Sequence, residues 1–378
     1  MSAQPSGAVS ESIRRTSRRR FLRGCGASLI GAGLGAPGAH AGATLGYGCK
    51  PGYDDPGVLA ALERATGISF SVATLGDESA ALAALGSADG KIDFYAGDAA
   101  LIEAAAAKGL ARPLEGAPFD RIGHDLLPPL RPPFEPLLHD GLTVALPTRW
   151  GWTGPILGAD ADPAAWRDYA AAFDPKQAGR VGVMAAETAP RLILALHAGV
   201  NPFARLDGAA SGELRRSYRA FFKNRPVPLA KRGDAAEALA SGALAAVIGP
   251  GSEFAAALRR RGILGCRALV AEPHDGVKQT LLWVEAVAVH SASTAPDAAG
   301  AALAALFEPA VGRALSLIEA APAPSASAAV RDLYSAGELA LLQDEDSDLA
   351  WRHGRLRRTI PDAAALQAIW DEERANAG

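Results

Sequence analysis

The sequence predicts an α/β fold with two domains, and three observations support this prediction. The chain has 378 residues, of which 49% are hydrophobic and 21% are charged, as in a globular protein long enough for two cores. Short runs of strand-forming residues alternate with runs whose apolar residues recur at helical spacing. A proline-rich loop at 128–136 interrupts this alternation, which then resumes. Because such alternation is typical of mostly parallel sheets flanked by helices, we expect two sheets of this kind.

The elements expected in the first domain follow this alternation closely. Pro56 and Gly57 precede a run with helical spacing, and Gly67 ends that run, as glycine commonly does at a helix end. The segment 68–72 then alternates as a half-buried strand does. The predicted strands are 45–48, 68–72 and 92–95, and the predicted helices are 58–64, 79–85 and 101–108.

A predicted strand at 142–147 ends where we place a hinge between the two domains. Beyond it we expect strands at 180–184 and 245–248, with helices at 189–198 and 235–240. Strand 281–289 then carries the chain back and is followed by a helix at 298–307. The predicted organisation is an export signal (1–41), a first domain (42–147 plus about 286–320), a second domain (148–285) and a C-terminal helical region packing on both (321–378).

The first 41 residues are expected to be a targeting segment. Ser17-Arg-Arg-Arg-Phe-Leu-Arg23 resembles the twin-arginine export signal, and a weakly apolar, glycine-rich stretch follows it. Ala39-His-Ala41 offers small residues for cleavage, so we place the mature N-terminus near Gly42. We therefore predict that the twin-arginine machinery exports the protein to the periplasm.

The predicted mature protein is acidic. Cleavage after Ala41 removes six arginines and one glutamate, which changes the formal net charge from −3 to −8. This charge argues against nucleic acids and anionic membrane surfaces as partners, and we expect a monomer. The spacing of Cys49 and Cys266 leaves open whether the two form a disulfide.

Sequence motifs of catalysis are absent from the expected mature chain. It contains no phosphate-binding Walker sequence and no Gly-x-Ser-x-Gly. The seven histidines never fall at metal-ligand spacing with a second histidine or cysteine. We therefore predict a binding protein rather than an enzyme, with neither a metal nor a cofactor.

One predicted strand carries a carboxylate where apolar residues are expected. Glu285 lies in the middle of 281–289, and burying an ionised carboxylate without a partner costs several kcal/mol or more. Because side chains alternate along a strand, Trp283 shares the face of Glu285. An indole beside a carboxylate suits a ligand ammonium group. The alternative is an internal ion pair between Glu285 and an arginine, such as Arg149 or Arg352.

Four segments in this order resemble the periplasmic solute-binding proteins of ABC importers, in particular the spermidine/putrescine-binding branch. They are Tyr53-Asp-Asp-Pro-Gly-Val-Leu59, Pro147-Thr-Arg-Trp-Gly-Trp-Thr153, Leu282-Trp-Val-Glu-Ala-Val-Ala-Val289 and Ala350-Trp-Arg-His353. The resemblance implies a type II-like periplasmic binding protein fold with a ligand cleft between the domains. It also implies that a hinge closes the cleft on a small ligand. The implied partners are the permease subunits of an importer.

The resemblance also implies where the ligand binds. Lys50 stands where the family has an aromatic residue, Glu187 is the candidate for its second-domain carboxylates, and Arg352 takes the C-terminal polar contact. The predicted ligand-binding residues are Lys50, Tyr53, Arg149, Trp150, Glu187, Trp283, Glu285 and Arg352. We expect a small amine-bearing solute, polyamine-like or zwitterionic. A small organic anion held by Lys50, Arg149 and Arg352 is the alternative ligand, and an exported ligand sensor is the alternative role.

Overall fold

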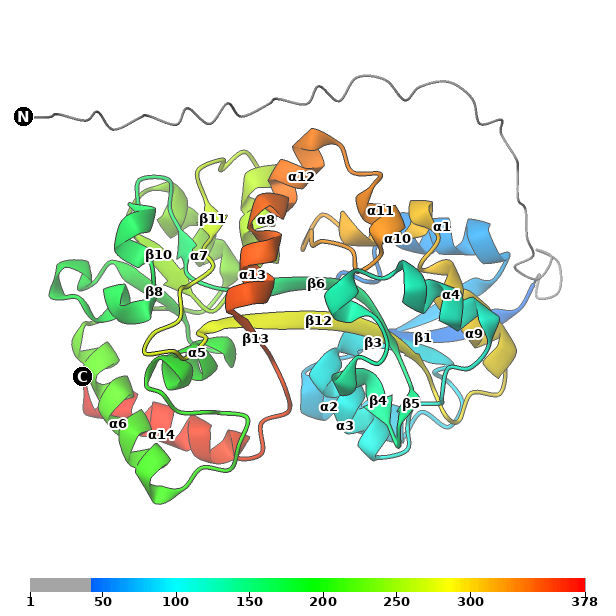
Figure 1. Ribbon diagram of the computed structural model, residues 1–378, viewed down its shortest axis with the longest axis horizontal. Helices are drawn as coiled ribbons and strands as arrows, with labels where there is room; N and C mark the ends of the chain where they lie inside the picture. Colours follow the sequence, from blue (N-terminus) through cyan, green and yellow to red (C-terminus); the bar gives the residue numbers. More distant parts are fainter. Residues whose placement is uncertain (1–41, 378) are drawn as a thin grey trace, which may run out of the picture. The chain divides into compact units, whose positions relative to one another are not determined.

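The computed structural model describes residues 42–377 (Figure 1). The predicted export signal and its cleavage site lie outside these residues. The strands form two main sheets, with helices packed against each, and a small hairpin of β4 (Leu138–His139) and β5 (Leu142–Thr143). The prediction of an α/β fold built on two sheets is therefore confirmed.

The first sheet has six strands, in the order β13-β12-β3-β1-β2, and β6 also pairs with β12. β1 is parallel to β2 and β3, whereas β12 is antiparallel to β3 and β6, so this sheet is more mixed than expected. Its strands are β1 (Thr44–Cys49), β2 (Ser69–Thr74), β3 (Phe94–Asp98), β6 (Leu146–Thr153), β12 (Thr280–Val289) and β13 (Gly354–Leu356).

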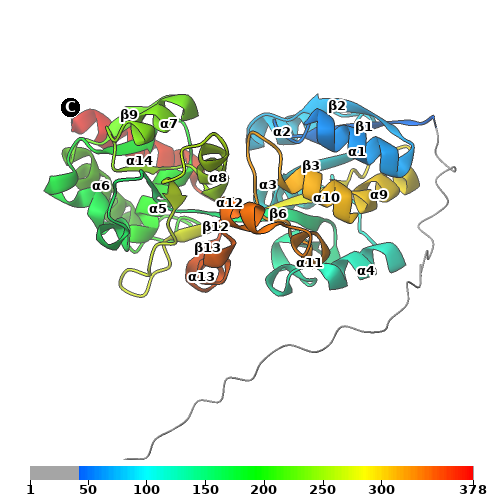
Figure 2. The same cartoon turned by 90° about the horizontal axis from the view of Figure 1, so that it is seen from above.

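Helices cover this sheet and bury its apolar side chains. α1 packs against α9 and α10 (Figure 2), and α3 contacts both α2 and β12. The helices in this part of the fold are α1 (Pro56–Thr66), α2 (Glu78–Gly86), α3 (Ala99–Ala107), α4 (Ala117–Asp125), α9 (Pro296–Ala305) and α10 (Pro309–Ser316). Within residues 42–377 no single helix is long and apolar enough to cross a membrane, and α9 with α10 reaches that length only as a pair bent by 73°.

Local sequence signals explain the first turn of this sheet, which leads into the candidate site. The carboxylate of Asp55 accepts hydrogen bonds from the amides of Gly57 and Val58 and so caps α1. Gly67 ends the helix in the left-handed region, with a φ of 70°. Gly46 has no room for a side chain, because a Cβ atom there would lie 1.8 Å from the carbonyl oxygen of Lys91. The β1–α1 connection is thus held in one place at the end of the sheet.

The second sheet has five strands in the order β11-β7-β10-β8-β9, in which β8 is parallel to β9 and β10, whereas β7 is antiparallel to β10 and β11. Its strands are β7 (Ile156–Leu157), β8 (Val181–Met184), β9 (Val227–Leu229), β10 (Ala246–Ile248) and β11 (Arg267–Ala268). The helices that follow are α5 (Ala189–His197), α6 (Gly208–Lys223), α7 (Arg232–Ala240) and α8 (Ser252–Arg260). Cys49 of the first sheet and Cys266, next to β11, are both buried and free, so they form no disulfide.

Two long strands link the sheets. β6 starts in the first sheet and is separated from β7 of the second by only two residues, whereas β12 pairs along β6 and continues to β3 (Figure 1). The predicted strand at 142–147 is therefore divided: β5 ends at Thr143, and β6 runs on through the expected hinge to Thr153.

The C-terminal region contains the expected helices and one strand that was not predicted. α14 packs against α6, and the guanidinium group of Arg219 donates two hydrogen bonds, of 2.8 and 3.0 Å, to the buried carboxylate of Glu373. β13 joins the first sheet next to β12. The helices are α11 (Ala328–Arg331), α12 (Ala336–Leu342), α13 (Ser347–His353) and α14 (Ala363–Asn376).

Candidate functional site

Three charged residues lie in a row across the first sheet. Glu285 on β12 stands directly opposite Asp98 on β3 and Arg149 on β6. Directly opposed residues of antiparallel strands project from the same face, so the three side chains are neighbours. Lys50 and Tyr53, from the β1–α1 connection, contact the same row.

Glu285 is almost completely buried and has protein partners on both carboxylate oxygens. Its Oε2 atom accepts hydrogen bonds from Nε of Arg149, at 2.8 Å, and from the hydroxyl of Tyr53, and Nη2 of Arg149 lies 2.7 Å from the same oxygen as an ion pair. Its Oε1 atom pairs with the ammonium group of Lys50. Only 2% of Glu285 is exposed. Of the two roles that the sequence leaves open, this geometry corresponds to the internal ion pair.

Arg149 is equally buried, and its remaining donors are also used. Its Nη1 atom donates hydrogen bonds to the carbonyl oxygens of Leu315 and Ala321, at 3.2 and 2.8 Å. The guanidinium lies over the ring of Tyr53, 4.6 Å from its centroid. A guanidinium with this many partners is fixed in orientation, so Arg149 serves to hold Glu285 in place.

The electrostatics keep this buried pair ionised. Burial alone would raise the pKa of Glu285, but the charges of Arg149 and Lys50 outweigh it and lower that pKa below its ordinary value. Burial alone would likewise lower the pKa of Lys50, whereas Asp98 and Glu285 raise it overall. At neutral pH these groups are therefore charged.

This ionisation makes the stability of the protein depend on pH. The folded pKa of Glu285 is lowered from about 4.5, so its stabilising effect is full above that pH and is lost as the pH falls through the folded value. We expect the free energy of unfolding, measured with urea, to decrease below about pH 4. In Glu285→Gln, which has no proton to bind, this decrease should be smaller. An identical pH profile in the two proteins would contradict the assignment.

The partly exposed edge of the row is formed by Lys50, Asp98 and Arg357. The ammonium group of Lys50 lies 3.2 Å from Oδ1 of Asp98, and Nη1 of Arg357 lies 3.6 Å from Oδ2. Their side chains are 35%, 32% and 29% exposed. Here we use "ion cluster" for five residues: Lys50, Asp98, Arg149, Glu285 and Arg357. Solvent reaches this cluster at its edge and not at Glu285.

Trp283 lies on the same strand face as Glu285 and is partly exposed. Its ring fills the space above Gly151, where a Cβ atom would be 2.3 Å from the ring, and its Nε1 atom lies close to Gly251, just before α8. Both glycines are therefore needed to accommodate the indole. The expected neighbourhood of Trp283 and Glu285 is present, with Lys50 and Tyr53 beside it.

The structure does not bring the other predicted residues into this cluster. Trp150 projects from the opposite face of β6, where it is 1% exposed and packs against Trp351, with 4.9 Å between ring centroids. Glu187 follows β8 of the second sheet and pairs instead with Arg232, at 3.0 Å. Arg352 is exposed and donates a long, 3.4 Å hydrogen bond to the carbonyl oxygen of Asp348 in its own helix.

Two members of the ion cluster, Asp98 and Arg357, were not predicted. Asp98 ends β3, three residues beyond the end of the predicted strand 92–95, and a charged residue at the end of a strand is a signal that could have been used. Arg357 follows the short strand β13, which has no alternating pattern to reveal it. Among residues 42–377, no group of three histidine, cysteine or carboxylate side chains is placed to hold a metal ion.

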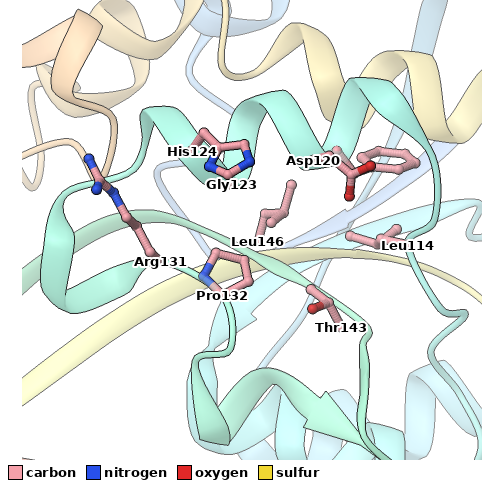
Figure 3. A pocket seen from close by; sticks show the side chains of 9 residues that line it. Leu114, Asp120, Gly123, His124, Arg131, Pro132, Thr143 and Leu146 are labelled. Atoms are coloured by element: carbon pink, nitrogen blue, oxygen red, sulfur yellow. The ribbon is translucent and has the colours of Figure 1, made fainter.

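A separate pocket of about 320 Å³ opens beside α4 (Figure 3). Leu114 and Leu146 contribute apolar surface, Asp120 and Arg131 supply charged groups, and His124 supplies an imidazole. All five side chains are drawn around the same opening in Figure 3. None of the residues lining the pocket belongs to the ion cluster, so the two features are distinct.

Solved structures share this fold. The spermidine/putrescine ABC transporter substrate-binding protein PotD of Streptococcus pneumoniae has a TM-score of 0.70 and 13% identity, over 89% of this chain and 100% of that one. A putative spermidine/putrescine ABC transporter from Listeria monocytogenes has a TM-score of 0.65 and 15% identity, over 88% of this chain and 98% of that one. AgtB of A. tumefaciens R10, in complex with agropinic acid, has a TM-score of 0.58 and 14% identity, over 89% of this chain and 98% of that one. At these identities the likeness shows the fold alone.

The family of the chain follows from its sequence. No curated protein sequence matches it. The family model for bacterial extracellular solute-binding proteins matches residues 57–338, about three quarters of the chain. This match covers both sheets apart from β1 and β13, and it confirms the resemblance found in the four segments. The chain belongs to the bacterial extracellular solute-binding protein family.

Proposed function

We propose that this protein is the periplasmic substrate-binding component of an ABC importer and that it captures a small amine-bearing solute. The observation that carries the proposal is the partly exposed edge of Lys50, Asp98 and Arg357, beside the partly exposed indole of Trp283, on one face of the first sheet. The fold shared with ABC transporter substrate-binding proteins supports the role in import.

In this proposal the residues have different tasks. The ring face of Trp283 attracts a ligand ammonium group, and Asp98 is the carboxylate accessible to it. Glu285 acts through its neighbours, because it fixes Lys50 and Arg149 by charge and hydrogen bonding. The buried hydroxyl of Tyr53 accepts a hydrogen bond from Nε of Arg149 and so helps to fix the same arrangement.

A small organic anion is the second candidate ligand, and one observation favours it. The ion cluster contains three cations, Lys50, Arg149 and Arg357, but only two carboxylates, Asp98 and Glu285. An anion would balance this excess of positive charge. Of the cations expected for such a ligand, Lys50 lies at the accessible edge, whereas Arg149 is buried.

The route and the partners belong to the same proposal. Export by the twin-arginine machinery would deliver a monomer to the periplasm, where it would close over its ligand and dock on permease subunits. Closure would bend β6 and β12, the two strands that link the sheets. An exported ligand sensor would use the same site, and neighbouring genes for a permease and an ATPase would favour the importer.

The test starts from the ligand that the protein retains. Native mass spectrometry of the exported protein, purified without refolding, should reveal a bound small solute. Saturation with that solute should raise the melting temperature and reduce the radius of gyration measured by X-ray scattering. If no solute is retained, and none from a panel of charged metabolites shifts the melting temperature, the proposal fails.

Trp283→Ala should weaken binding of the retained solute roughly 10-fold, because an indole contributes about 0.5–2 kcal/mol to holding a cation in addition to its apolar contact. Isothermal titration calorimetry measures this change. Phe70→Ala, on the distant strand β2, removes a partly buried aromatic ring and serves as the control, with unchanged affinity expected. Equal affinities for Trp283→Ala and the unaltered protein would exclude the indole from the site.

A further inference from the structure

Arg357 is held beside the ion cluster by the end of strand β13. Its backbone amide donates a 2.8 Å hydrogen bond to the carbonyl oxygen of Leu282 on β12, which continues the parallel pairing of the two strands by one residue. Its side chain then reaches Asp98 at the end of β3, which follows β13 along the same edge of β12. The position of Arg357 is therefore set by the sheet, although the residue lies far along the chain from the rest of the cluster.

The protein satisfies this guanidinium only in part. The contact between Nη1 and Asp98 is long, at 3.6 Å, and Nε of Arg357 is buried with no hydrogen-bond partner among residues 42–377. Elsewhere in the chain the same edge of an arginine, formed by Nε and Nη2, holds a carboxylate. Arg331 binds Asp344 in this way, at 2.9 and 2.7 Å. At Arg357, residues 42–377 supply no carboxylate to this edge.

The charges around Arg357 also indicate that a negatively charged group is missing at the accessible edge of the ion cluster. Glu285 and Arg149 pair with each other in the buried part of the ion cluster, so the uneven charge lies at the accessible edge. There Lys50 and Arg357 share Asp98, although Lys50 also contacts Glu285. A ligand with ammonium groups alone would add positive charge to this edge, whereas a ligand carboxylate would neutralise it.

We propose that Arg357 is an anion-binding residue of the solute site and that the ligand is an amino-acid-like zwitterion. Its carboxylate binds the guanidinium of Arg357 next to Lys50, and its ammonium group lies near Asp98 and Trp283. The guanidinium turns its Nε and Nη2 edge toward the bound carboxylate. This inference rests on the proposed function and specifies the chemical class of its solute.

Matched probes test the requirement for a carboxylate. Ornithine and putrescine, and likewise arginine and agmatine, differ only in the carboxylate, so calorimetry with these two pairs and with spermidine isolates its effect. We expect the carboxylated member of at least one pair to bind at least 10-fold more tightly than its decarboxylated partner, on the scale of a charged hydrogen bond. The inference is overturned if putrescine, agmatine or spermidine binds and neither amino acid does, although the solute-binding role would then stand.

Variants then assign the preference to Arg357. Arg357→Gln should weaken the carboxylated probe roughly 10- to 100-fold and leave the decarboxylated probe nearly unchanged. Arg357→Lys, which keeps the charge, should recover part of the loss. Arg355→Gln is the matched control, since Arg355 lies on the same strand but donates to Asn201. If Arg357→Gln still prefers the carboxylated probe, the inference is contradicted. If none of the five probes binds, the inference is also overturned, and the solute retained by the purified protein then decides the proposed function.

Discussion

Glu285→Gln should lower the free energy of unfolding of the unliganded protein by about 3–5 kcal/mol, the range for breaking a buried ion pair. Glutamine keeps the shape of the side chain but removes the charge that Arg149 and Lys50 face. Arg149 is only 2% exposed, so water cannot replace the lost carboxylate. Its hydrogen bonds to two backbone carbonyl oxygens remain, but they leave its charge uncompensated. Urea unfolding without ligand measures the loss.

Glu272→Gln provides the matched control for this experiment. Glu272 forms a two-point pair with Arg167, but both side chains are exposed to solvent, so little or no change in the free energy of unfolding is expected. The opposite pattern for Glu285→Gln, with unchanged unfolding and lost ligand binding, would identify Glu285 as a direct partner of a ligand ammonium group. That is the role that the pairing of Trp283 and Glu285 suggests from sequence.

Trp150→Ala should cost about 3–5 kcal/mol of unfolding free energy, as expected for the removal of a fully buried tryptophan. Trp150 is 1% exposed and packs between Trp152 and Trp351, with centroid distances of 6.2 and 4.9 Å. Alanine leaves a cavity there that the surrounding strands cannot close. Thermal and urea unfolding both report this loss.

Trp283→Ala, on the opposite face, is the comparison for this variant, because Trp283 is partly exposed. Its stability loss should be clearly smaller, while its effect on affinity should be larger. If Trp150→Ala instead keeps the unfolding free energy of the unaltered protein but fails to retain the solute, Trp150 lines the ligand site, as the family resemblance implies.

Much of the fold could be predicted because local signals and tertiary structure agree. Asp55 and Gly67 mark the ends of α1, and the alternation along 281–289 places Trp283 and Glu285 on one face of β12. By contrast, α6 was not predicted. Its buried apolar residues recur at helical spacing (214, 218, 221 and 222), so the signal was present in the sequence, and the helix packs against α14, which lies about 150 residues further along the chain.

The candidate site could be predicted only in part, because strand pairing decides which residues meet. Arg149 and Trp150 are adjacent in sequence, yet one reaches Glu285 and the other packs on the reverse face. The register between β6 and β12 makes that choice, and it shifts by one residue just beyond Glu285. Asp98 and Arg357 enter the cluster through two further pairings of β12, which no local pattern encodes.

The division of the ion cluster into a buried part and an accessible edge has a consequence for how such a protein acquires a new ligand. Substitutions at Arg149 or Glu285 each leave a buried charge alone, so their effects are strongly coupled and a single step is unfavourable. Arg357 is partly exposed and tied by one long contact, so it can change without unfolding the protein. Laboratory selection for altered specificity should therefore enrich substitutions at Arg357 and leave the buried pair untouched.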